Sequence, residues 1–357
     1  MTTNIEQANS TIRTPTTEYI ESINLLRGVA AFLVVCEHIV GRTPYAIFNQ
    51  YFGWLDNLGI YGVIIFFVIS GFILPYSLGD KYQLRGYGQF LLRRFVRIQP
   101  VYFVSIAVSI TFTAILTRIA PNAIPFVIDF KILLLHSLYL IPFTQEPWLQ
   151  GVYWTLAIEF QFYIVIGILY PWFRSISAKS VIYLCLIPIS LSLIAFSYSF
   201  VESLQLVKYL PYFSLGIFCS LQYKRKISKT LLIAVIFVLS TILLILGTNI
   251  YELFVGATTF FIILLWRSNP FANNPLGRLI LFFSTISYSW YATHQTFAGA
   301  GESLAKFILK LNSFPSQLLI VNLVPIFIFL VSIVFAYIIH LLVEIPSHKL
   351  ARKIKYK

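Results

Sequence analysis

The sequence predicts an all-α membrane protein, a polytopic helical bundle, and three observations support this prediction. Hydrophobic residues make up 58% of the chain and charged residues only 11%, whereas a soluble domain carries about 25% charged residues. The mean hydropathy is +0.82. Apolar runs recur along the chain, and each approaches the roughly 20 residues that a membrane-crossing helix needs.

Ten apolar runs are candidate spans, so we expect about ten transmembrane helices in one membrane domain over residues 23–342. Residues 1–22 form a polar N-terminal tail, and residues 343–357 form a basic C-terminal tail. An apolar stretch in the long connection at 119–151 is too short to cross a bilayer, which favours an interfacial segment. The candidate spans are 23–40, 58–78, 99–118, 152–172, 180–198, 206–222, 230–247, 250–266, 279–300 and 318–342.

The charge distribution predicts the topology. The chain has 26 Lys and Arg against 13 Asp and Glu, a net charge of +13. Of these basic residues, 20 fall in one set of alternate loops and 6 in the other. Because cytoplasmic loops carry the basic excess, both termini are expected in the cytoplasm and the number of spans is even. The positive charge therefore indicates topology, and we expect no nucleic-acid partner.

The first span carries three ionisable residues in an apolar run, Arg27, Glu37 and His38. A charged group inside a span costs roughly 2.5 kcal/mol or more, so it usually faces the protein interior or a watery cavity. Arg27 and His38 are eleven positions apart, which in an α-helix places them about 20° from each other and about 16 Å apart along the axis. We expect one face of this helix to present both groups to a functional site.

The end of the second span and the start of the third suggest a close helix contact and a basic site. Ser70 and Gly71 are small residues in a bulky run, with Pro75 nearby, which favours close helix approach or a kink. Arg93 and Arg97 are four positions apart and share a helical face. They either anchor the span to lipid phosphates or clamp a phosphorylated ligand, because a guanidinium fork matches phosphate oxygens.

The fourth span places Thr155, Glu159 and Tyr163 on one stripe at a spacing of four. A carboxylate inside an apolar run needs a partner. Glu159 is therefore either a structural hydrogen-bond acceptor or a group that orients a histidine or binds a hydroxyl. The residue types leave both interpretations open.

The ninth span places Ser287, Tyr291 and His294 on one face. This puts a second imidazole inside the membrane. It is either a structural residue whose hydrogen bonds are made within the helical bundle or part of a functional site. The three cysteines are expected to be packing residues, and no metal site is expected. Three further histidines lie in loops or at span ends and are assigned no role: His136, His340 and His348.

Six segments in order along the chain resemble the acyltransferase 3 family of multispanning membrane acyltransferases. LRGVAAFLVVCEH carries an Arg, ten residues and a His, and the others are FFVISGFIL, RRFVRIQP, WTLAIEFQFY, ISYSWYATH and VEIP. The chain departs from the family pattern at two positions. Phe160 stands where many relatives have a second acid, and Glu37 precedes the histidine.

The resemblance implies an enzyme of the bacterial inner membrane. Such an enzyme moves an acyl group, commonly acetyl, from cytosolic acyl-CoA to a hydroxyl of a cell-surface polysaccharide or lipid-linked sugar. Acyl-CoA is then a substrate, and no permanently bound cofactor is expected. The alternative is a polyprenyl-sugar flippase or glycoside exporter, which would be indifferent to acyl-CoA.

The resemblance also implies residue roles. His38 is expected to be a general base or a transient acyl carrier, since an imidazole with a pKa of about 6.5 suits proton transfer near neutrality. Glu159 and Arg27 complete the expected catalytic group. The expected donor-binding residues are Arg27, Ser70, Arg93 and Arg97, and the expected acceptor-binding or oxyanion-stabilising residues are Trp154, Thr155, Tyr291 and His294.

Overall fold

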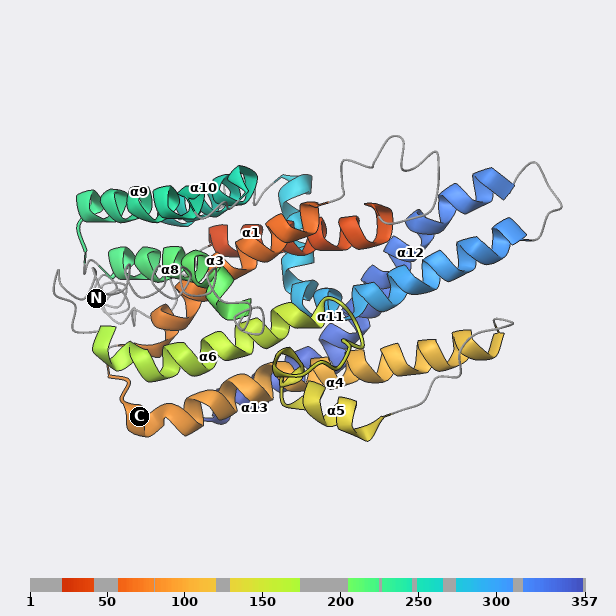
Figure 1. The fold of residues 1–357 in the computed structure, drawn as a ribbon, viewed down its shortest axis with the longest axis horizontal. Helices are drawn as coiled ribbons and strands as arrows, with labels where there is room; N and C mark the ends of the chain where they lie inside the picture. Colours follow the sequence, from red (N-terminus) through yellow and green to blue (C-terminus); the bar gives the residue numbers. More distant parts are fainter. Residues whose placement is uncertain are drawn as a thin grey trace, which may run out of the picture.

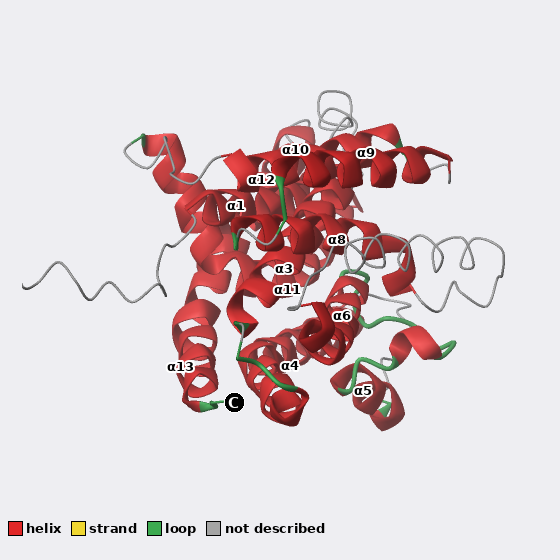
Figure 2. Cartoon of the chain, turned by 90° about the vertical axis from the view of Figure 1, so that its left-hand side faces the viewer, coloured by secondary structure: helices red, strands yellow, loops and turns green. Residues whose placement is uncertain are grey.

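The computed structural model describes residues 21–41, 57–79, 81–119, 129–173, 205–224, 227–245, 249–265, 274–310 and 317–355. Within these ranges the protein is helical and has no strand (Figure 2), which confirms the all-α prediction for the described part. The α-helices are α1 (Glu21–Cys36), α3 (Leu58–Leu78), α4 (Tyr87–Ile119), α5 (Phe130–Ser137), α6 (Tyr153–Phe173), α8 (Gln205–Tyr223), α9 (Lys229–Ile245), α10 (Ile250–Leu265), α11 (Pro275–Lys310), α12 (Gln317–Ile339) and α13 (Ile345–Lys353).

Nine of the ten predicted spans fall on helices of the described part, while 180–198 and most of the predicted N-terminal tail lie outside it. Not all nine helices meet the requirements for crossing a membrane. Among the described residues, five segments are long and apolar enough, and the number ten and the position of the termini stay predictions. These five are Ser22–Val40, Leu58–Leu78, Leu84–Arg118, Tyr153–Trp172 and Ile320–Lys353.

Most of the long helices run along the longest dimension of the molecule, whereas the first part of α11, drawn in cyan, crosses this direction (Figure 1). The most extensive packing joins α3 to α8 and to α1, and α1 and α12 to α11. One large core cluster lies where α3, α6 and α8 meet, around the stacked rings of Phe162 and Phe213, whose centroids are 4.0 Å apart. The helices therefore hold one another through their inner faces.

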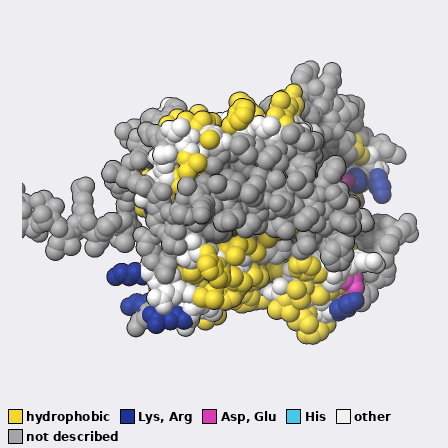
Figure 3. Space-filling model, turned by 60° about the vertical axis from the view of Figure 1, so that its left-hand side comes forward, with side chains coloured by type: hydrophobic (Ala, Val, Ile, Leu, Met, Phe, Trp, Pro, Cys, Tyr) yellow, Lys and Arg dark blue, Asp and Glu magenta, His cyan; other side chains and the backbone are white. Residues whose placement is uncertain are grey.

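The outer surface of the bundle is strongly apolar. Phe237, Phe254, Leu265 and Leu342 are each at least 70% exposed. On the face drawn in Figure 3, hydrophobic side chains form broad patches, and lysines and arginines lie near the edges. Contiguous apolar surface of this extent needs a partner, and for spanning helices the partner is lipid.

Gly71 of α3 and Gly216 of α8 allow these two helices to approach closely. A Cβ atom on Gly71 would lie 2.1 Å from the carbonyl oxygen of Phe213, and one on Gly216 would lie 2.0 Å from that of Val68. Both distances are far below van der Waals contact, so neither backbone can carry a side chain there. The close approach predicted from Ser70 and Gly71 is confirmed at Gly71.

Alanine at Gly216 is expected to lower the stability of the purified protein by about 1–3 kcal/mol, because the added methyl group separates α3 from α8. The measurement is thermal unfolding in detergent. Gly88 of α4 is the matched control, since a Cβ there meets nothing within 4 Å. Equal melting temperatures for Gly216→Ala and Gly88→Ala would contradict this account of the interface.

Two π-helical segments interrupt the α-helical register, at Glu37–Gly41 and His340–Glu344. The first begins one residue before His38, so the predicted angle between Arg27 and His38 assumed an α-helical turn where the structure has a π-helical one. In this turn the Glu37 carboxylate accepts a hydrogen bond from the backbone N–H of Gly59, in the first turn of α3. A carboxylate at a helix N-terminus satisfies an orphan donor and the helix dipole. Glu37 therefore joins α1 to α3.

The C-terminal segment predicted as a basic tail is ordered as α13, which packs on α4 and buries Ser347 and Ala351. The apolar stretch after Asp129 forms the short helix α5, as expected for a segment that does not cross the membrane. The helical structure therefore includes two short helices, α5 and α13, besides the long ones.

His136 of α5 is fully buried and fixes the loop that follows. The Leu149 N–H donates to His136 Nε2 at 3.1 Å, so Nδ1 carries the proton and faces the Tyr102 hydroxyl at 3.0 Å. This arrangement requires a neutral ring. Burial lowers the pKa of His136 to about 4, which keeps the imidazole neutral near pH 7.

The melting temperature is expected to fall as the pH drops from about 6.5 towards 4. In this window the unfolded His136 binds a proton that the folded ring does not, so acid favours unfolding. A His136→Phe variant removes this titration and should show a shallower decline in detergent over the same window. If the melting temperature falls equally steeply with pH in both proteins, the decline is caused by groups other than His136.

Candidate active site

A cavity of about 920 Å³, its mouth included, opens between α1, α3, α4, α6, α11 and the C-terminal segment. Its apolar lining comes largely from α3, and its polar lining from the facing helices. Three arginines and two glutamates lie in the wall, so with a neutral His348 the ionised groups of the wall carry a small positive excess. The polar lining residues are Arg27, Ser70, Arg94, Arg97, Thr155, Glu159, Tyr163, Ser287, Tyr288, Tyr291, Glu344 and His348.

The basic wall contains Arg94 and Arg97, whereas Arg93 is not part of the lining. Arg94 is 7% exposed, and its Nη2 donates to Ser77 Oγ at 2.8 Å. Its guanidinium also lies 5.8 Å from the ring centroid of Tyr163. Positions 94 and 97 of α4 therefore line the cavity, whereas Arg93, which lies about 100° around the helix from Arg94, does not.

Arg27 and Arg97 are held by partners distant in the sequence. Arg27 Nη2 donates to Ser287 Oγ of α11 at 3.0 Å. Arg97 Nε donates to His348 Nε2 of α13 at 3.3 Å. The structure thus brings two of the three predicted donor-binding arginines, Arg27 and Arg97, into one cavity from α1 and α4.

Glu159 lies in the wall opposite the arginines and accepts two hydrogen bonds. The donors are Ser70 Oγ at 3.0 Å and the Tyr163 hydroxyl at 2.6 Å. Thr155, Glu159 and Tyr163 all line the cavity, as the spacing of four indicated. Glu159 receives its hydrogen bonds from these hydroxyls rather than from His38, so in this state it does not orient the histidine.

A pair of hydroxyls forms the end of the cavity that faces the histidines. Thr155 Oγ1 and the Tyr291 hydroxyl lie 2.6 Å apart. On the other side of Tyr291 is His294, whose ring centroid lies 5.6 Å from that of Tyr291. His38 follows, with its ring edge-to-face to His294 at 5.0 Å. The two predicted histidines therefore meet each other, behind the wall that the cavity presents.

Both histidines have their Nδ1 atoms fixed by carbonyl oxygens. His38 Nδ1 lies 2.9 Å from the Val34 oxygen, and His294 Nδ1 lies 2.7 Å from the Tyr291 oxygen. A carbonyl only accepts, so each Nδ1 carries the proton and, in a neutral ring, each Nε2 carries the lone pair. His38 thus has the tautomer that a base acting through Nε2 requires.

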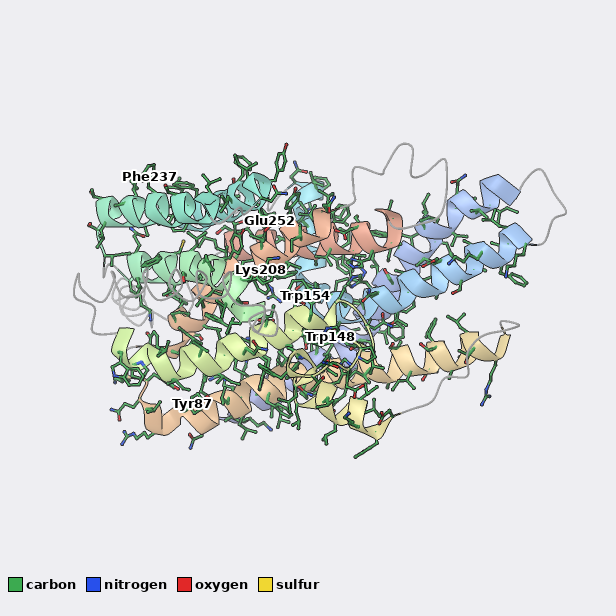
Figure 4. All side chains as sticks on the ribbon, viewed as in Figure 1. Tyr87, Trp148, Trp154, Lys208, Phe237 and Glu252 are labelled. Carbon is green, nitrogen blue, oxygen red and sulfur yellow. The ribbon has the colours of Figure 1, made fainter. Side chains whose placement is uncertain are left out.

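Trp154, labelled in Figure 4, is predicted to bind the acceptor but is not among the residues that line the cavity. Its ring packs on Tyr209 at 5.3 Å and on Phe67 at 6.4 Å. In the structure it belongs to the aromatic contact between α3, α6 and α8.

Among the arginines, glutamates and histidines of the lining, the sequence-based prediction missed Arg94, Glu344 and His348. The choice between Arg93 and Arg94 depends on which face of α4 points inward, and sequence spacing alone does not give this. Glu344 lies at the end of the second π-helical segment, and such segments are frequent at functional sites. The VEIP segment was the feature of the sequence that could have indicated Glu344 as a site residue.

Comparison with known proteins agrees with this geometry. An acyltransferase-domain family model, Acyl_transf_3, matches residues 20–341. Peptidoglycan O-acetyltransferase OatA of Listeria monocytogenes is 31% identical over 159 residues, which are 42% of this chain and 24% of that protein. Acyltransferase MdmB of Streptomyces mycarofaciens is 27% identical over 168 residues, which are 45% of this chain and 41% of that protein.

The matched segments span less than half the length of either relative. No solved structure matches the chain significantly. The family model, in contrast, covers most of the chain and includes every helix from α1 to α12 that contributes to the cavity. On this match, which encloses five of the six sequence segments, the chain belongs to the acyltransferase 3 family.

Proposed function

We propose that the protein is a membrane O-acyltransferase that moves an acetyl group from acetyl-CoA to a hydroxyl of a cell-surface polysaccharide or lipid-linked sugar. The observation that carries the proposal is the cavity itself, with three arginines in its lining and the contacting rings of His38 and His294 next to Tyr291. The name of one relative, a peptidoglycan O-acetyltransferase, supports acetyl as the acyl group and an envelope sugar as the acceptor class.

The acyl donor is held by the arginines. Three guanidinium groups, of Arg27, Arg94 and Arg97, line one cavity. A guanidinium group forms bidentate hydrogen bonds with phosphate oxygens. Coenzyme A carries several phosphates at one end and the thioester at the other. The phosphates therefore lie at the arginine end, and the pantetheine arm extends along the apolar surface of α3.

His38 supplies the base. Its Nε2 takes the proton of the acceptor hydroxyl as the oxygen attacks the thioester carbonyl carbon. The carbon–sulfur bond then breaks, and the CoA thiolate leaves and recovers the proton from the imidazolium. The Val34 carbonyl fixes the tautomer and becomes a partner of the imidazolium that forms transiently.

Thr155 and Tyr291 lie between the donor and this base. Their hydroxyls are 2.6 Å apart, and His38 is not part of the cavity lining. Transfer therefore requires this pair to separate, after which both hydroxyls are placed to donate to the thioester oxygen as negative charge develops on it. Glu159, held by Ser70 and Tyr163, faces the same space and binds the acceptor hydroxyls.

The proposal is tested by incubating membranes that contain the protein with acetyl-labelled acetyl-CoA. The expected result is ester-linked label in the glycan or glycolipid fraction that is absent from membranes lacking the protein. A flippase or exporter would leave acetyl-CoA untouched and label nothing. That outcome would refute the proposed function.

A further inference from the structure

A chain of polar side chains runs from the cavity wall into the C-terminal segment. Arg97 Nε donates to His348 Nε2, and Glu344 Oε1 lies 3.8 Å from the same nitrogen. Glu344 is 1% exposed, and its other oxygen accepts from Ser289 Oγ at 2.6 Å and from His340 Nδ1 at 3.0 Å. We propose that His348 is a positioning residue that sets Arg97 for the acyl donor. This inference rests on the proposed function.

The hydrogen bond fixes the chemical form of His348. A guanidinium has only donors, so Nε2 of His348 must accept and the ring is neutral with its proton on Nδ1. His348 therefore acts on Arg97 as an acceptor and not as a second cation. Its contribution is to the direction of the guanidinium plane rather than to the charge of the cavity.

The geometry leaves one edge of Arg97 for a ligand. Guanidinium groups bind oxyanions through either of two edges, each made of two parallel N–H donors. Within the described part of the chain, Arg97 uses the edge that contains Nε for His348. The terminal Nη1–Nη2 edge is then the one available to two oxygens of a phosphate, in a plane already fixed before the donor arrives.

The C-terminal fold explains why these groups meet α4. The π-helical segment His340–Glu344 shifts the register between α12 and α13, and α13 then packs on α4. Glu344 and His348 are four positions apart and both line the cavity. Removing His348 should leave Arg97 in place with its full charge but in several rotamers, so donor binding weakens while the chemical step is unaffected.

The test uses the purified full-length protein and acetyl-CoA as the probe. For His348→Leu we expect the Kd for acetyl-CoA to rise about tenfold, the size of one charge-assisted hydrogen bond. The transfer rate in membranes at saturating acetyl-CoA should stay within about twofold of wild type. His348→Gln places an acceptor oxygen near the position of Nε2 and should bind acetyl-CoA as wild type does. In an Arg97→Gln background, His348→Leu should add no more than about a twofold loss.

Three results would overturn the inference: an unchanged Kd in His348→Leu, equal weakening in the Leu and Gln variants, or a full tenfold loss that persists without Arg97. If the leucine variant does not fold, His348→Asn takes its place, because its shorter amide does not reach Arg97. Wild-type protein that fails to bind acetyl-CoA refutes the proposed function as well, whereas normal wild-type binding with no difference among variants refutes the positioning role alone.

Discussion

Replacement of His38 by asparagine is expected to lower the rate of acyl transfer at least about a hundredfold, the range lost when a general base is removed. Asparagine can keep the hydrogen bond to the Val34 carbonyl through its amide nitrogen but has no lone pair that takes a proton at neutral pH. The Kd for acetyl-CoA should stay near the wild-type value, because the arginines that bind the donor are unchanged. The measurement is labelled-acetyl transfer in membranes with matched protein levels.

Because His38 is only half-buried, its replacement by asparagine is expected to leave the protein folded, so that a loss of transfer reports on the reaction. His38 Nδ1 is hydrogen-bonded to the Val34 carbonyl one turn earlier in the chain, and the amide nitrogen of asparagine can preserve this bond. Melting temperatures of variant and wild type in detergent serve as the control for folding. A His38→Asn protein that is folded and still transfers acetyl groups at the wild-type rate would remove the histidine from the mechanism.

Arg94→Gln and Arg97→Gln are each expected to weaken acetyl-CoA binding about ten- to a hundredfold, the cost of losing one or two hydrogen bonds between charged groups. Arg93→Gln is the matched control. It removes the same charge one residue away, but Arg93 does not line the cavity, so binding should change less than about twofold. The measurement that checks this prediction is the Kd of acetyl-CoA for each of the three purified variants.

This comparison separates the two interpretations of the basic cluster. If all three variants weaken binding equally, the cluster acts only through its summed charge. If only Arg93→Gln weakens binding, the donor does not enter this cavity, and the assignment of the arginine wall is wrong.

The local features of the site were predictable from the sequence because they depend on helical periodicity. The stripe Thr155, Glu159 and Tyr163 lines the cavity as the spacing of four indicated, and α3 begins and ends at the predicted residues Leu58 and Leu78. Gly71 marked the close approach of α3 and α8. In each case the pattern lies within one helix, and the backbone geometry of that helix decides the outcome.

The remaining features depend on contacts between distant segments. Arg97 meets His348 across 251 positions, which no local pattern reveals. Arg94 rather than Arg93 faces the cavity because Phe90 and Tyr163 pack around its guanidinium. The π-helical turn at Glu37 also changes the direction of His38, which a uniform helical wheel does not predict.

The central claim is that this protein acetylates an envelope sugar through His38, and mass spectrometry of surface glycans tests it most directly. Three strains are compared: a deletion of the gene, the deletion complemented with wild type, and the deletion complemented with His38→Asn. We predict that O-acetyl esters disappear on deletion, return with the wild-type protein and stay absent with His38→Asn. Equal acetylation of the surface glycans in all three strains would contradict the account.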